Sequence, residues 1–551
     1  MNRPWIEKYD AHVPADVEFP AISIPDQFKL AAEKYSDQIF IDFEDSLFTY
    51  DEIYKLAIHL SVNLKAIGLK AGDRVGLMLP NIPQFVVCYY AILMAGGIVT
   101  AINPAYTFNE VEALILQAGT RFLVCMEDRA EELSALNVSG GVEELIITQK
   151  TGFQKFHKPS KFILKNSQKL QLLDLLKTTQ GIENENMARI NPLDPAIFQF
   201  SGGTTGAPKP AMGSHRNIIA NIHQFSAWCN LQELGEVILT AIPLYHVYGM
   251  VLGMNIALTV GAKVVLIANP SDTESLLQKI EEKEVTFFPG VPTMYHAINT
   301  NEDVLIKKYK LDSIEACISG SFTLHASIKE KFESITGGSL MEGYGLSEAP
   351  TATHCNPLRG KNKTGSIGLP LPGVNAKIVD EEDHTVEKPV GEIGELAIRG
   401  PQVMLGYHDQ PAATADTIKD GWLLTGDIAY MDEEGYFFLV DRKKALIKVN
   451  GLQVWPNEVE NVLNSHPGVR ESAVAGVEDV VHGEKVIAWV VTNSGADLNQ
   501  EKLRELCRNS LAAYKVPSEI LFVDSVPRSG VGKVLRRILV SEYPGNKTKK
   551  G

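Results

Sequence analysis

The stretch AIFQFSGGTTGAPKP (residues 196–210) joins an apolar run to a loop of glycines and hydroxyl-bearing residues. The run at 196–200 predicts a buried strand, because short apolar runs that end in turn residues are typical of strands inside a sheet. In the loop, three glycines let backbone N–H groups converge on one point, and two threonines add hydroxyl donors. Lys209 brings a positive charge to the same loop. The stretch therefore predicts a polyanion site, above all for a triphosphate.

This loop differs from a Walker phosphate-binding loop. That motif has Gly directly before its Lys and Ser or Thr directly after it, whereas Pro208 and Pro210 flank Lys209. A helix therefore cannot begin at the phosphates as it does in P-loop ATPases. Taken alone, the stretch also fits an ordinary polar, glycine-rich turn, so the motifs further along the chain decide between these interpretations.

Length and composition indicate a globular protein with more than one domain. A chain of 551 residues is too long for a single core. The net charge of −15 argues against a nucleic-acid partner, because proteins that bind phosphate backbones carry basic patches. The six cysteines are scattered and form no CxxC pair, so we expect free thiols in a reducing compartment.

Four segments bear on localisation. The N-terminal sequence MNRPWIEKYD lacks the apolar core of a signal peptide, so we expect a cytoplasmic protein. The uncharged stretches 85–102 and 237–262 are interrupted by Gly or Pro, and each predicts a buried helix joined to a buried strand rather than a membrane span. The segment 149–173 carries six lysines and no acidic residue. It fits either a solvated surface insertion or a peripheral contact with the inner membrane face.

The order of apolar runs predicts an α/β fold. Between residues 70 and 345, short apolar runs alternate with helical patterns, which is typical of parallel α/β layers. The expected strands span 74–79, 98–102, 121–125, 144–148, 196–200, 237–242, 263–268, 286–288 and 315–319. Further short strands at 395–399, 421–424, 429–432 and 436–440 predict a β-rich subdomain. We expect a large N-terminal domain (1–441) of layered α/β subdomains with this β-rich subdomain, and a small mobile α+β C-terminal domain (442–551).

Three further motifs contain residue types suited to nucleotide chemistry. In EGYGLSE (342–348), a tyrosine between glycines can lie flat against a base, Ser347 can bond a phosphate, and Glu348 is a hard oxygen ligand for Mg²⁺. In LTGD (424–427), Asp427 at a strand end can bind ribose hydroxyls, assisted by Arg442. In PRSGVGK (527–533), Lys533 follows a glycine-containing loop that can carry it into a cleft. Each motif alone also fits a turn or a solvated side chain.

Taken in this order, the motifs resemble the adenylate-forming superfamily of acyl-CoA synthetases, and most closely the bacterial-type long-chain fatty-acid–CoA ligases. The resemblance covers nearly the whole chain and includes GDRV (72–75), NPAYT (103–107), PLYH (243–246), DRKK (441–444) and YKVP (514–517). It implies ATP-dependent, AMP-forming ligation of a long-chain fatty acid to coenzyme A through an acyl-adenylate, with release of pyrophosphate. It also implies Mg²⁺ as cofactor and ATP and CoA as co-substrates. The oligomeric state is left open between a monomer and a homodimer.

The resemblance also implies a role for individual residues. The residues expected to bind ATP are Ser201, Gly202, Gly203, Thr204, Thr205, Gly206, Lys209, Gly320, Ser321, Phe322, Glu342, Gly343, Tyr344, Gly345, Ser347, Asp427, Arg442 and Lys533. Those expected to be catalytic are Lys533, Glu348, Lys209 and His246, with Glu348 and Thr204 facing the metal. Lys444 matches the superfamily's hinge, and Gly451 matches the passage for the pantetheine arm of CoA.

The acyl pocket is expected beside His246, which stands at the gate between the nucleotide and acyl sites. It would be lined by Tyr248, Gly249 and Gly253. Two glycines on adjacent helical turns lack side chains and would leave a channel for an alkyl tail. The alternative is that both glycines only permit close packing of the helix on a sheet, and that His246 is a half-buried structural histidine.

Several positions depart from the superfamily's common pattern, and other functions stay open. Gly202, Ser347, the pair Ser321–Phe322 and Pro210 each replace a more usual residue. Within the superfamily, the alternatives are an aryl- or medium-chain acyl-CoA ligase, an acyl-AMP ligase that serves a carrier protein, and a luciferase-like oxygenase. From a different class, the alternative is a catalytically dead nucleotide- or lipid-binding regulator. The sequence has no GxSxG or HExxH motif to support a hydrolase.

Overall fold

The structure is a computed structural model that describes residues 3–44, 46–138, 141–150, 169–177, 189–201, 208–449, 452–479, 483–493, 495–528 and 533–544. The chain divides into two compact units. The first comprises residues 1–201, 208–375 and 399–423, and the second comprises 202–207, 376–398 and 424–551. The boundary at 441/442 expected from the sequence therefore stays a prediction. Most of the lysine-rich segment 149–173, namely 151–168, lies outside the described residues.

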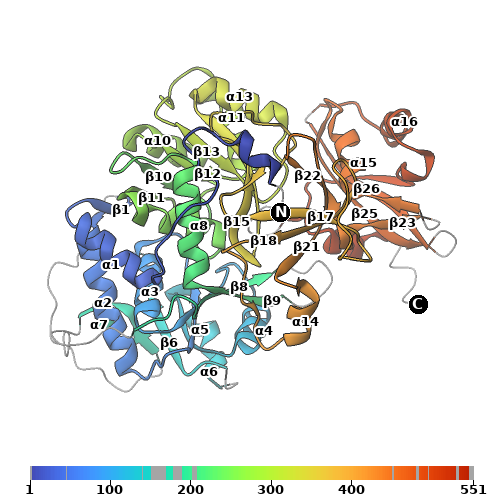
Figure 1. The fold of residues 1–551 in the computed structure, drawn as a ribbon. Coiled ribbons are helices and arrows are strands. Elements are labelled where there is room, and N and C mark those ends of the chain that lie inside the picture. The colour runs from blue at the N-terminus through green and yellow to red at the C-terminus, as the bar shows by residue number, and fades with distance from the viewer. Residues whose placement is uncertain are drawn as a thin grey trace. The chain divides into compact units, whose positions relative to one another are not determined.

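The first unit contains a sheet that includes the strands before and after the glycine-rich loop, β8 and β9 (Figure 1). Within the described residues, this sheet has eight strands in the order β19-β9-β8-β4-β3-β5-β6-β7. Strand β8 is parallel to β4 and antiparallel to β9, so the loop between β8 and β9 joins two neighbouring strands. The strands are β3 (Arg74–Met78), β4 (Ile98–Ala101), β5 (Thr120–Met126), β6 (Glu144–Thr148), β7 (Lys169–Gln171), β8 (Pro195–Ser201), β9 (Lys209–Ser214) and β19 (Gly406–Tyr407).

A second sheet in the same unit has nine strands within the described residues, in the order β16-β15-β14-β13-β12-β10-β11-β1-β2. The pairs β10–β12, β12–β13 and β13–β14 are parallel, and β14–β15 is antiparallel. The strands are β1 (Ile39–Phe43), β2 (Ser46–Thr49), β10 (Val237–Thr240), β11 (Lys263–Leu266), β12 (Phe287–Gly290), β13 (Ala316–Ser319), β14 (Ser339–Leu346), β15 (Ala349–Cys355) and β16 (Leu369–Pro370). Each strand expected between residues 74 and 319 is present within two residues of its expected bounds.

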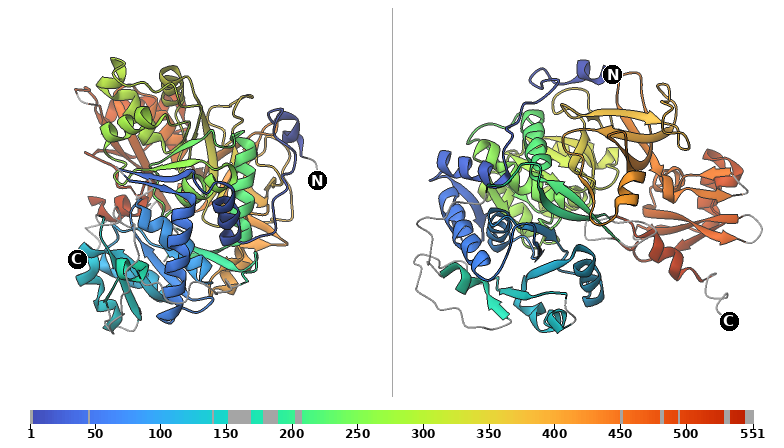
Figure 2. Two further views of the ribbon diagram at one scale, coloured as in Figure 1. Left: turned by 90° about the vertical axis from the view of Figure 1, so that its left-hand side faces the viewer. Right: turned by 60° about the horizontal axis from the view of Figure 1, so that its bottom comes forward.

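Helices cover these sheets. The long apolar stretch at 85–102 forms α3 followed by β4, and every residue of α3 is buried, as expected for a helix between layers. Helices α1, α2 and α3 pack against one another (Figures 1 and 2). The helices of this unit are α1 (Ile24–Lys34), α2 (Tyr50–Ala66), α3 (Pro83–Met94), α4 (Phe108–Ala118), α5 (Ala130–Leu133), α6 (Ala135–Val138), α7 (Leu172–Lys177), α8 (His215–Trp228), α9 (Ala257–Val260), α10 (Thr273–Lys283), α11 (Pro292–Thr300), α12 (Glu302–Leu305), α13 (Ala326–Thr336) and α14 (Pro411–Thr417). A π-helix spans Gly249–Asn255.

The second unit contains a β-rich part and an α+β part. In the β-rich part, β18 (Gly394–Arg399) lies between β17 (Asn375–Val379) and β21 (Trp422–Met431), and β22 (Phe437–Arg442) pairs with β21. The two-residue strand β20 (Ile418–Lys419) pairs with the start of β21, and both of these parts lie in the stretch 399–423 of the first unit. The separate strands expected at 421–424 and 429–432 are therefore wrong, because β21 is continuous through Gly426. Gly426 has a φ of +70° and permits an irregular strand where the sequence pattern indicated a turn.

The α+β part is built on one sheet in the order β24-β23-β26-β25, with β27 beside β26. Its core contains Val474, Val490 and Leu503. Its elements are β23 (Ile447–Val449), β24 (Leu452–Val454), α15 (Pro456–Asn464), β25 (Val469–Asp479), β26 (Gly483–Thr492), α16 (Gln500–Ser510), β27 (Glu519–Phe522) and α17 (Arg536–Glu542). The expected fold class is confirmed, with a large α/β part, a β-rich sheet and a smaller α+β part.

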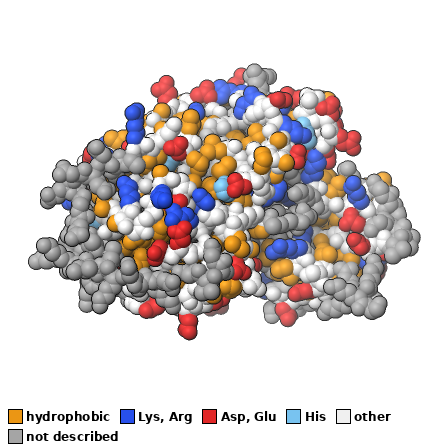
Figure 3. Space-filling view, turned by 90° about the horizontal axis from the view of Figure 1, so that it is seen from below, with side chains coloured by type: hydrophobic (Ala, Val, Ile, Leu, Met, Phe, Trp, Pro, Cys, Tyr) orange, Lys and Arg blue, Asp and Glu red, His pale blue; other side chains and the backbone are white. Residues whose placement is uncertain are grey.

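The surface and the helices give two further observations. Figure 3 shows one face of the molecule, on which basic and acidic side chains are interspersed with hydrophobic ones. In the part of the chain that the structure describes, no helix is both long and apolar enough to span a bilayer.

His215 connects the start of α8 to the start of α1. Its side chain is buried, and its Nδ1 accepts a hydrogen bond from the backbone N–H of Ile24 at 3.3 Å. Burial lowers the pKa of His215 to about 4. The ring is therefore neutral in the folded protein at physiological pH, and protonation would remove the acceptor.

We predict that His215→Asn makes the protein less sensitive to acid. Because folding lowers the pKa of His215 from 6.5 to about 4, its contribution to stability is present above pH 6.5 and is lost as the pH falls toward 4. Each unit of pKa difference corresponds to about 1.4 kcal/mol. The melting temperature of the variant should fall less than that of the wild type between pH 6.5 and 4.5. His296→Asn, at an exposed histidine, is the control, and equal losses in the wild type and His215→Asn would contradict the prediction.

Candidate active site

The carboxyl ends of parallel strands gather several predicted site residues in the first unit. Strands β10, β12, β13 and β14 run in the same direction and end at one edge of the sheet, which is where ligands bind in α/β sheets. Residues 320–322 follow β13 directly, and 342–346 form the second half of β14. The chain reaches His246 a few residues after β10 ends. Segments expected to bind adenine and to gate the acyl site therefore meet at this edge.

Tyr248 connects the acyl-gate segment to the ends of β12 and β13. Its hydroxyl oxygen lies 2.6 Å from the carbonyl oxygen of Ile318, to which it donates, and 3.2 Å from that of Gly290. The ring also lies against Gly320, where an added Cβ would be 3.0 Å from a ring carbon. Tyr248 thus brings the predicted acyl-pocket and adenine-slot segments into direct contact.

Gln199 connects the same segment to the stem of the glycine-rich loop. It lies on β8 with its side chain buried, and its Oε1 accepts a hydrogen bond from the backbone N–H of Val247 at 3.1 Å. The half-buried ring of His246 accepts through Nδ1 from the N–H of Tyr248 at 3.2 Å. Strand β8 therefore ends beside the His246 segment. The loop residues Gly202, Gly203, Thr204, Thr205 and Gly206 lie outside the described residues, as does Gly451.

Glu342 holds the segment after β13 to β14. Its Oε1 accepts a hydrogen bond from the backbone N–H of Leu324 at 3.3 Å. Burial raises the pKa of this carboxyl to about 8, so it is mainly protonated at neutral pH. Within this segment, Ser321 has a φ of +77°. Glu342 and Leu324 thereby fix the turn that carries Gly320, Ser321 and Phe322.

The glycines around Tyr344 are explained by strand packing. A Cβ on Gly345 would lie 1.8 Å from the carbonyl oxygen of Thr351, so only glycine lets β14 and β15 approach so closely. The ring of Tyr344 is buried and meets the ring of His354 edge-on, with centroids 5.8 Å apart. Ser347 follows at the turn into β15 and is half-buried.

Tyr407 joins two residues that the sequence placed near phosphate. Its hydroxyl donates to Oε1 of Glu348 at 2.8 Å, and Nζ of Lys209 lies 5.1 Å from the centroid of its ring. Burial, followed by the nearby Glu348 carboxylate, raises the pKa of Tyr407 well above its usual range, so the hydroxyl is protonated and donates. Tyr407 could not be predicted from the sequence, because no spacing or charge pattern links position 407 to position 348.

In the second unit, Asp427 and Arg442 face each other on β21 and β22. They are partners in the antiparallel register, and Nε of Arg442 lies 2.5 Å from Oδ1 of Asp427. Asp427 is buried, whereas the Arg442 side chain is 42% exposed. Lys533 is exposed next to the isolated bridge between Arg528 and Val534, and Lys444 lies in the short turn Lys443–Ala445.

The two glycines of the expected acyl channel face the sheet at close range. A Cβ on Gly249 would lie 2.3 Å from the carbonyl oxygen of Pro243, and one on Gly253 would lie 2.8 Å from Cγ2 of Thr240. These glycines therefore do not leave a channel, and that prediction is wrong. They permit close packing of the π-helix on β10 and the residues that follow it, which is the alternative stated above.

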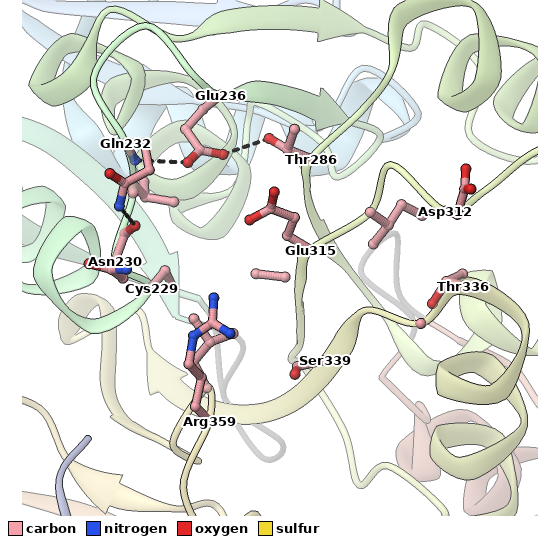
Figure 4. A pocket seen from close by; sticks show the side chains of 15 residues that line it. Cys229, Asn230, Gln232, Glu236, Thr286, Asp312, Glu315, Thr336, Ser339 and Arg359 are labelled. Atoms are coloured by element: carbon pink, nitrogen blue, oxygen red, sulfur yellow. Dashed lines mark hydrogen bonds between the residues drawn. The ribbon is translucent and has the colours of Figure 1, made fainter. Parts of the chain in front are cut away.

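A cavity of about 780 Å³ lies elsewhere in the first unit (Figure 4). Its lining includes Thr286, Glu315 and Ser339, which stand at the amino ends of β12, β13 and β14. Glu236, also in the lining, accepts hydrogen bonds from the hydroxyl of Thr286 at 2.6 Å and the N–H of Gln232 at 2.8 Å. This cavity is thus at the opposite ends of the strands from the predicted site, and none of the predicted site residues lines it.

The fold and these motifs define an adenylate-forming enzyme. The chain matches the AMP-binding enzyme family over residues 28–408 and the AMP-binding enzyme C-terminal domain over residues 458–533. The chain therefore belongs to the AMP-binding enzyme family, and the expected resemblance is confirmed.

Individual relatives match over nearly the full length. The chain is 38% identical to a long-chain-fatty-acid–CoA ligase of Bacillus subtilis (strain 168), over 99% of each chain. It is 36% identical to the enzyme of the same name from Escherichia coli O6:H1, again over 99% of each chain. Among solved structures, ATP-bound MatB from Rhodopseudomonas palustris matches with a TM-score of 0.84 and 28% identity, over 95% of this chain and 99% of MatB.

We predict that Gly249→Ala destabilises the protein rather than narrowing an acyl channel. The added Cβ meets the Pro243 carbonyl, so the backbone must shift at a cost of about 1–3 kcal/mol. Gly253→Ala is the matched comparison and should cost less, because its Cβ meets the end of the Thr240 side chain. Thermal melting of both variants tests this. A Gly249→Ala protein that melts like the wild type but prefers shorter fatty acids would contradict it.

Proposed function

We propose that this protein joins a long-chain fatty acid to coenzyme A, using ATP and releasing AMP and pyrophosphate. The observation that carries the proposal is the full-length identity of 36–38% with long-chain-fatty-acid–CoA ligases of two bacteria. The meeting of the β8 stem, the His246 segment and the ends of β13 and β14 in one unit supports it. The preference for a long chain rests on those relatives, since the two glycines do not form a channel.

The chemistry requires two steps. A carboxylate resists attack by a thiol, because its leaving group would be oxide. The carboxylate oxygen therefore attacks the α-phosphorus of ATP, the bond from that phosphorus to the bridging oxygen breaks, and pyrophosphate leaves. In the second step the CoA thiolate attacks the carbonyl carbon of the acyl-adenylate, and AMP leaves. A thiol with a pKa near 8.5 is already partly ionised at neutral pH, so no strong base is required.

The glycine-rich loop and several residues of the first unit are assigned to ATP. The loop from Ser201 to Gly206, with Lys209, would hold the β- and γ-phosphates. The turn that Glu342 fixes, together with Gly343 and Tyr344, would hold adenine. His246 would separate the nucleotide from the acyl chain. Lys209 lies at the start of β9, Gly343 and Tyr344 lie on β14, and a hydrogen bond to Glu342 holds the turn after β13, so these described groups are oriented before the substrate binds. Positioned charges of this kind stabilise a transition state.

The residues around Glu348 fit a magnesium ion that arrives with ATP. Mg²⁺ is usually bound through one or two carboxylates plus substrate phosphates. Glu348 offers one half-buried carboxylate held by Tyr407, and Thr204 is the second proposed ligand. The described residues include no cluster of three or more His, Cys, Asp or Glu side chains that would form an all-protein site. When bound, Mg²⁺ would neutralise phosphate charge, and Glu348 would orient it.

Residues of the second unit are assigned to ribose, to the acyl carboxylate and to CoA. The Asp427 carboxylate, paired with Arg442, would accept hydrogen bonds from the ribose hydroxyls. Lys533 would contact the carboxylate and the α-phosphate during adenylation. We propose that the chain then turns at Lys444, which withdraws Lys533 and brings Gly451 to the path of the pantetheine arm.

The test is pyrophosphate release measured with even-numbered fatty acids from acetate upward, benzoate and 4-coumarate, each with and without CoA. We expect kcat/KM to rise with chain length, because each buried CH₂ contributes about 0.8 kcal/mol, roughly fourfold per CH₂. Continuous turnover should require CoA. A preference for the aromatic acids would indicate an aryl-CoA ligase. Absence of pyrophosphate release with every acid would overturn the proposal.

We predict that Lys533→Ala lowers the rate of acyl-adenylate formation by a factor on the order of 10² or more, because one electrostatic donor to the transition state is lost. Thioester formation from supplied acyl-AMP should be retained, because Lys533 would be outside the cleft in that step. The two half-reactions are measured separately. Lys502→Ala, which removes an exposed lysine paired with Asp497, is the control. Equal loss in both half-reactions would exclude this role.

A further inference from the structure

Tyr407 lies on a segment that is fixed to two parts of the proposed phosphate site. The backbone N–H of Met404 donates to the carbonyl oxygen of Glu348, and that of His408 donates to the carbonyl oxygen of Pro210, both at 2.9 Å. Strand β19 also pairs with β9, with Tyr407 opposite Ala211. The segment 404–408 is thus bonded on one side to Glu348 and on the other to the strand that begins with Lys209.

The Tyr407 backbone is held from a third direction. Its N–H donates to Oγ1 of Thr414 at 2.9 Å, and Thr414 lies in α14. The preceding Gly406 has a φ of +140°, and a Cβ there would lie 2.7 Å from Cγ2 of Thr414. A backbone bonded on three sides and a side chain that is only 8% exposed leave the phenol and the ring little freedom.

The Tyr407 side chain contacts two opposite charges in different ways. Its hydroxyl donates to Oε1 of Glu348, and the face of its ring lies beneath the ammonium group of Lys209. Lys209 and Glu348 form no ion pair with each other in the described part of the chain. The other carboxylate oxygen of Glu348, Oε2, accepts no hydrogen bond from the described residues.

This arrangement keeps both charges available for ligands. If Lys209 and Glu348 paired directly, ATP and its metal would have to break that pair before binding. A phenol instead satisfies one oxygen of Glu348 and leaves the other oxygen for a cation, which is the usual way a neighbouring group orients a carboxylate ligand. The electron-rich ring face attracts the ammonium group without neutralising its charge.

We infer that Tyr407 is a positioning residue for adenylation, orienting Glu348 toward Mg²⁺ and Lys209 toward the triphosphate. The inference rests on the proposed function. Two chemical groups of the Tyr407 side chain would then have separate effects. The hydroxyl acts on the metal ligand, and the ring acts on the lysine.

Substitutions separate the two parts. Tyr407→Phe removes the hydroxyl and keeps the ring, so it should weaken binding of ATP with Mg²⁺ about tenfold, as loss of a partner to a metal ligand typically does. Its affinity for ATP in EDTA should equal that of the wild type. Tyr407→Leu removes the ring as well, and should also weaken binding of metal-free ATP by about two- to fivefold. Isothermal titration calorimetry without fatty acid measures both affinities.

Two controls make the result specific. Tyr50→Phe removes another buried phenol, which donates to backbone carbonyls of Ala257 and Ala262, and it should leave both affinities unchanged. In Glu348→Gln, adding Tyr407→Phe should weaken ATP binding with Mg²⁺ no further, because the two residues act through one contact.

A kinetic measurement adds a second readout. The Mg²⁺ concentration for half-maximal pyrophosphate release should rise in Tyr407→Phe.

The outcomes distinguish this inference from the proposed function. A wild-type protein that binds no ATP and releases no pyrophosphate would refute the proposed function. A wild type that does both, with a Tyr407→Phe variant that binds ATP with Mg²⁺ normally, would overturn only the inference. Equal loss of affinity with Mg²⁺ and with EDTA would also overturn it, because that result indicates a general disturbance of the site.

Discussion

The parallel pairing of β10, β12, β13 and β14 is the constraint on which the candidate site depends. Parallel strands end at the same edge, so segments separated by a hundred residues emerge side by side. Their turns contain polar groups that would be costly to bury without partners. Tyr248 and Glu342 supply those partners, one to the carbonyl oxygen of Ile318 and one to the N–H of Leu324. The strand order of the sheet thus determines which segments lie together, and a few buried hydrogen bonds fix the orientation of those segments.

Two glutamates near the end of β14 have different environments and different uses. Glu342 is buried, and its raised pKa of about 8 keeps it mainly neutral at physiological pH. A neutral carboxyl holds the turn at 320–324 without placing a negative charge beside the proposed nucleotide site. Glu348 is half-buried and accepts a hydrogen bond from a phenol through one carboxylate oxygen. The same residue type therefore acts as a structural hydrogen-bond acceptor at one position and as a proposed metal ligand six residues later, according to its burial.

The sequence predicted the layers and the site segments better than the contacts within them. Apolar runs such as 144–148 and 263–268 gave strands, because burial in a parallel sheet requires continuous apolar residues. Asp427 and Arg442, which the sequence assigned to the same ligand, are partners in the register of β21 and β22. Tyr407 was missed because its importance comes from the pairing of β19 with β9, a contact between residues about 200 positions apart. The hinge role of Lys444 and the ligand roles of Lys533 and Gly451 remain predictions from family resemblance.

The glycines show most clearly which features could not be predicted from the sequence. The sequence attributed the glycines at 249, 253 and 345 to space for a ligand. At Gly249 and Gly253 the neighbouring atoms belong to Pro243 and Thr240, and at Gly345 to the backbone of Thr351. At Gly426 the positive φ permits an irregular strand that leads directly into the Asp427–Arg442 pair. Each glycine satisfies a steric demand of packing, and that packing in turn places the polar residues beside it. A glycine in a functional motif can therefore serve the ligand indirectly, by letting strands and helices approach closely enough for their side chains to form the site.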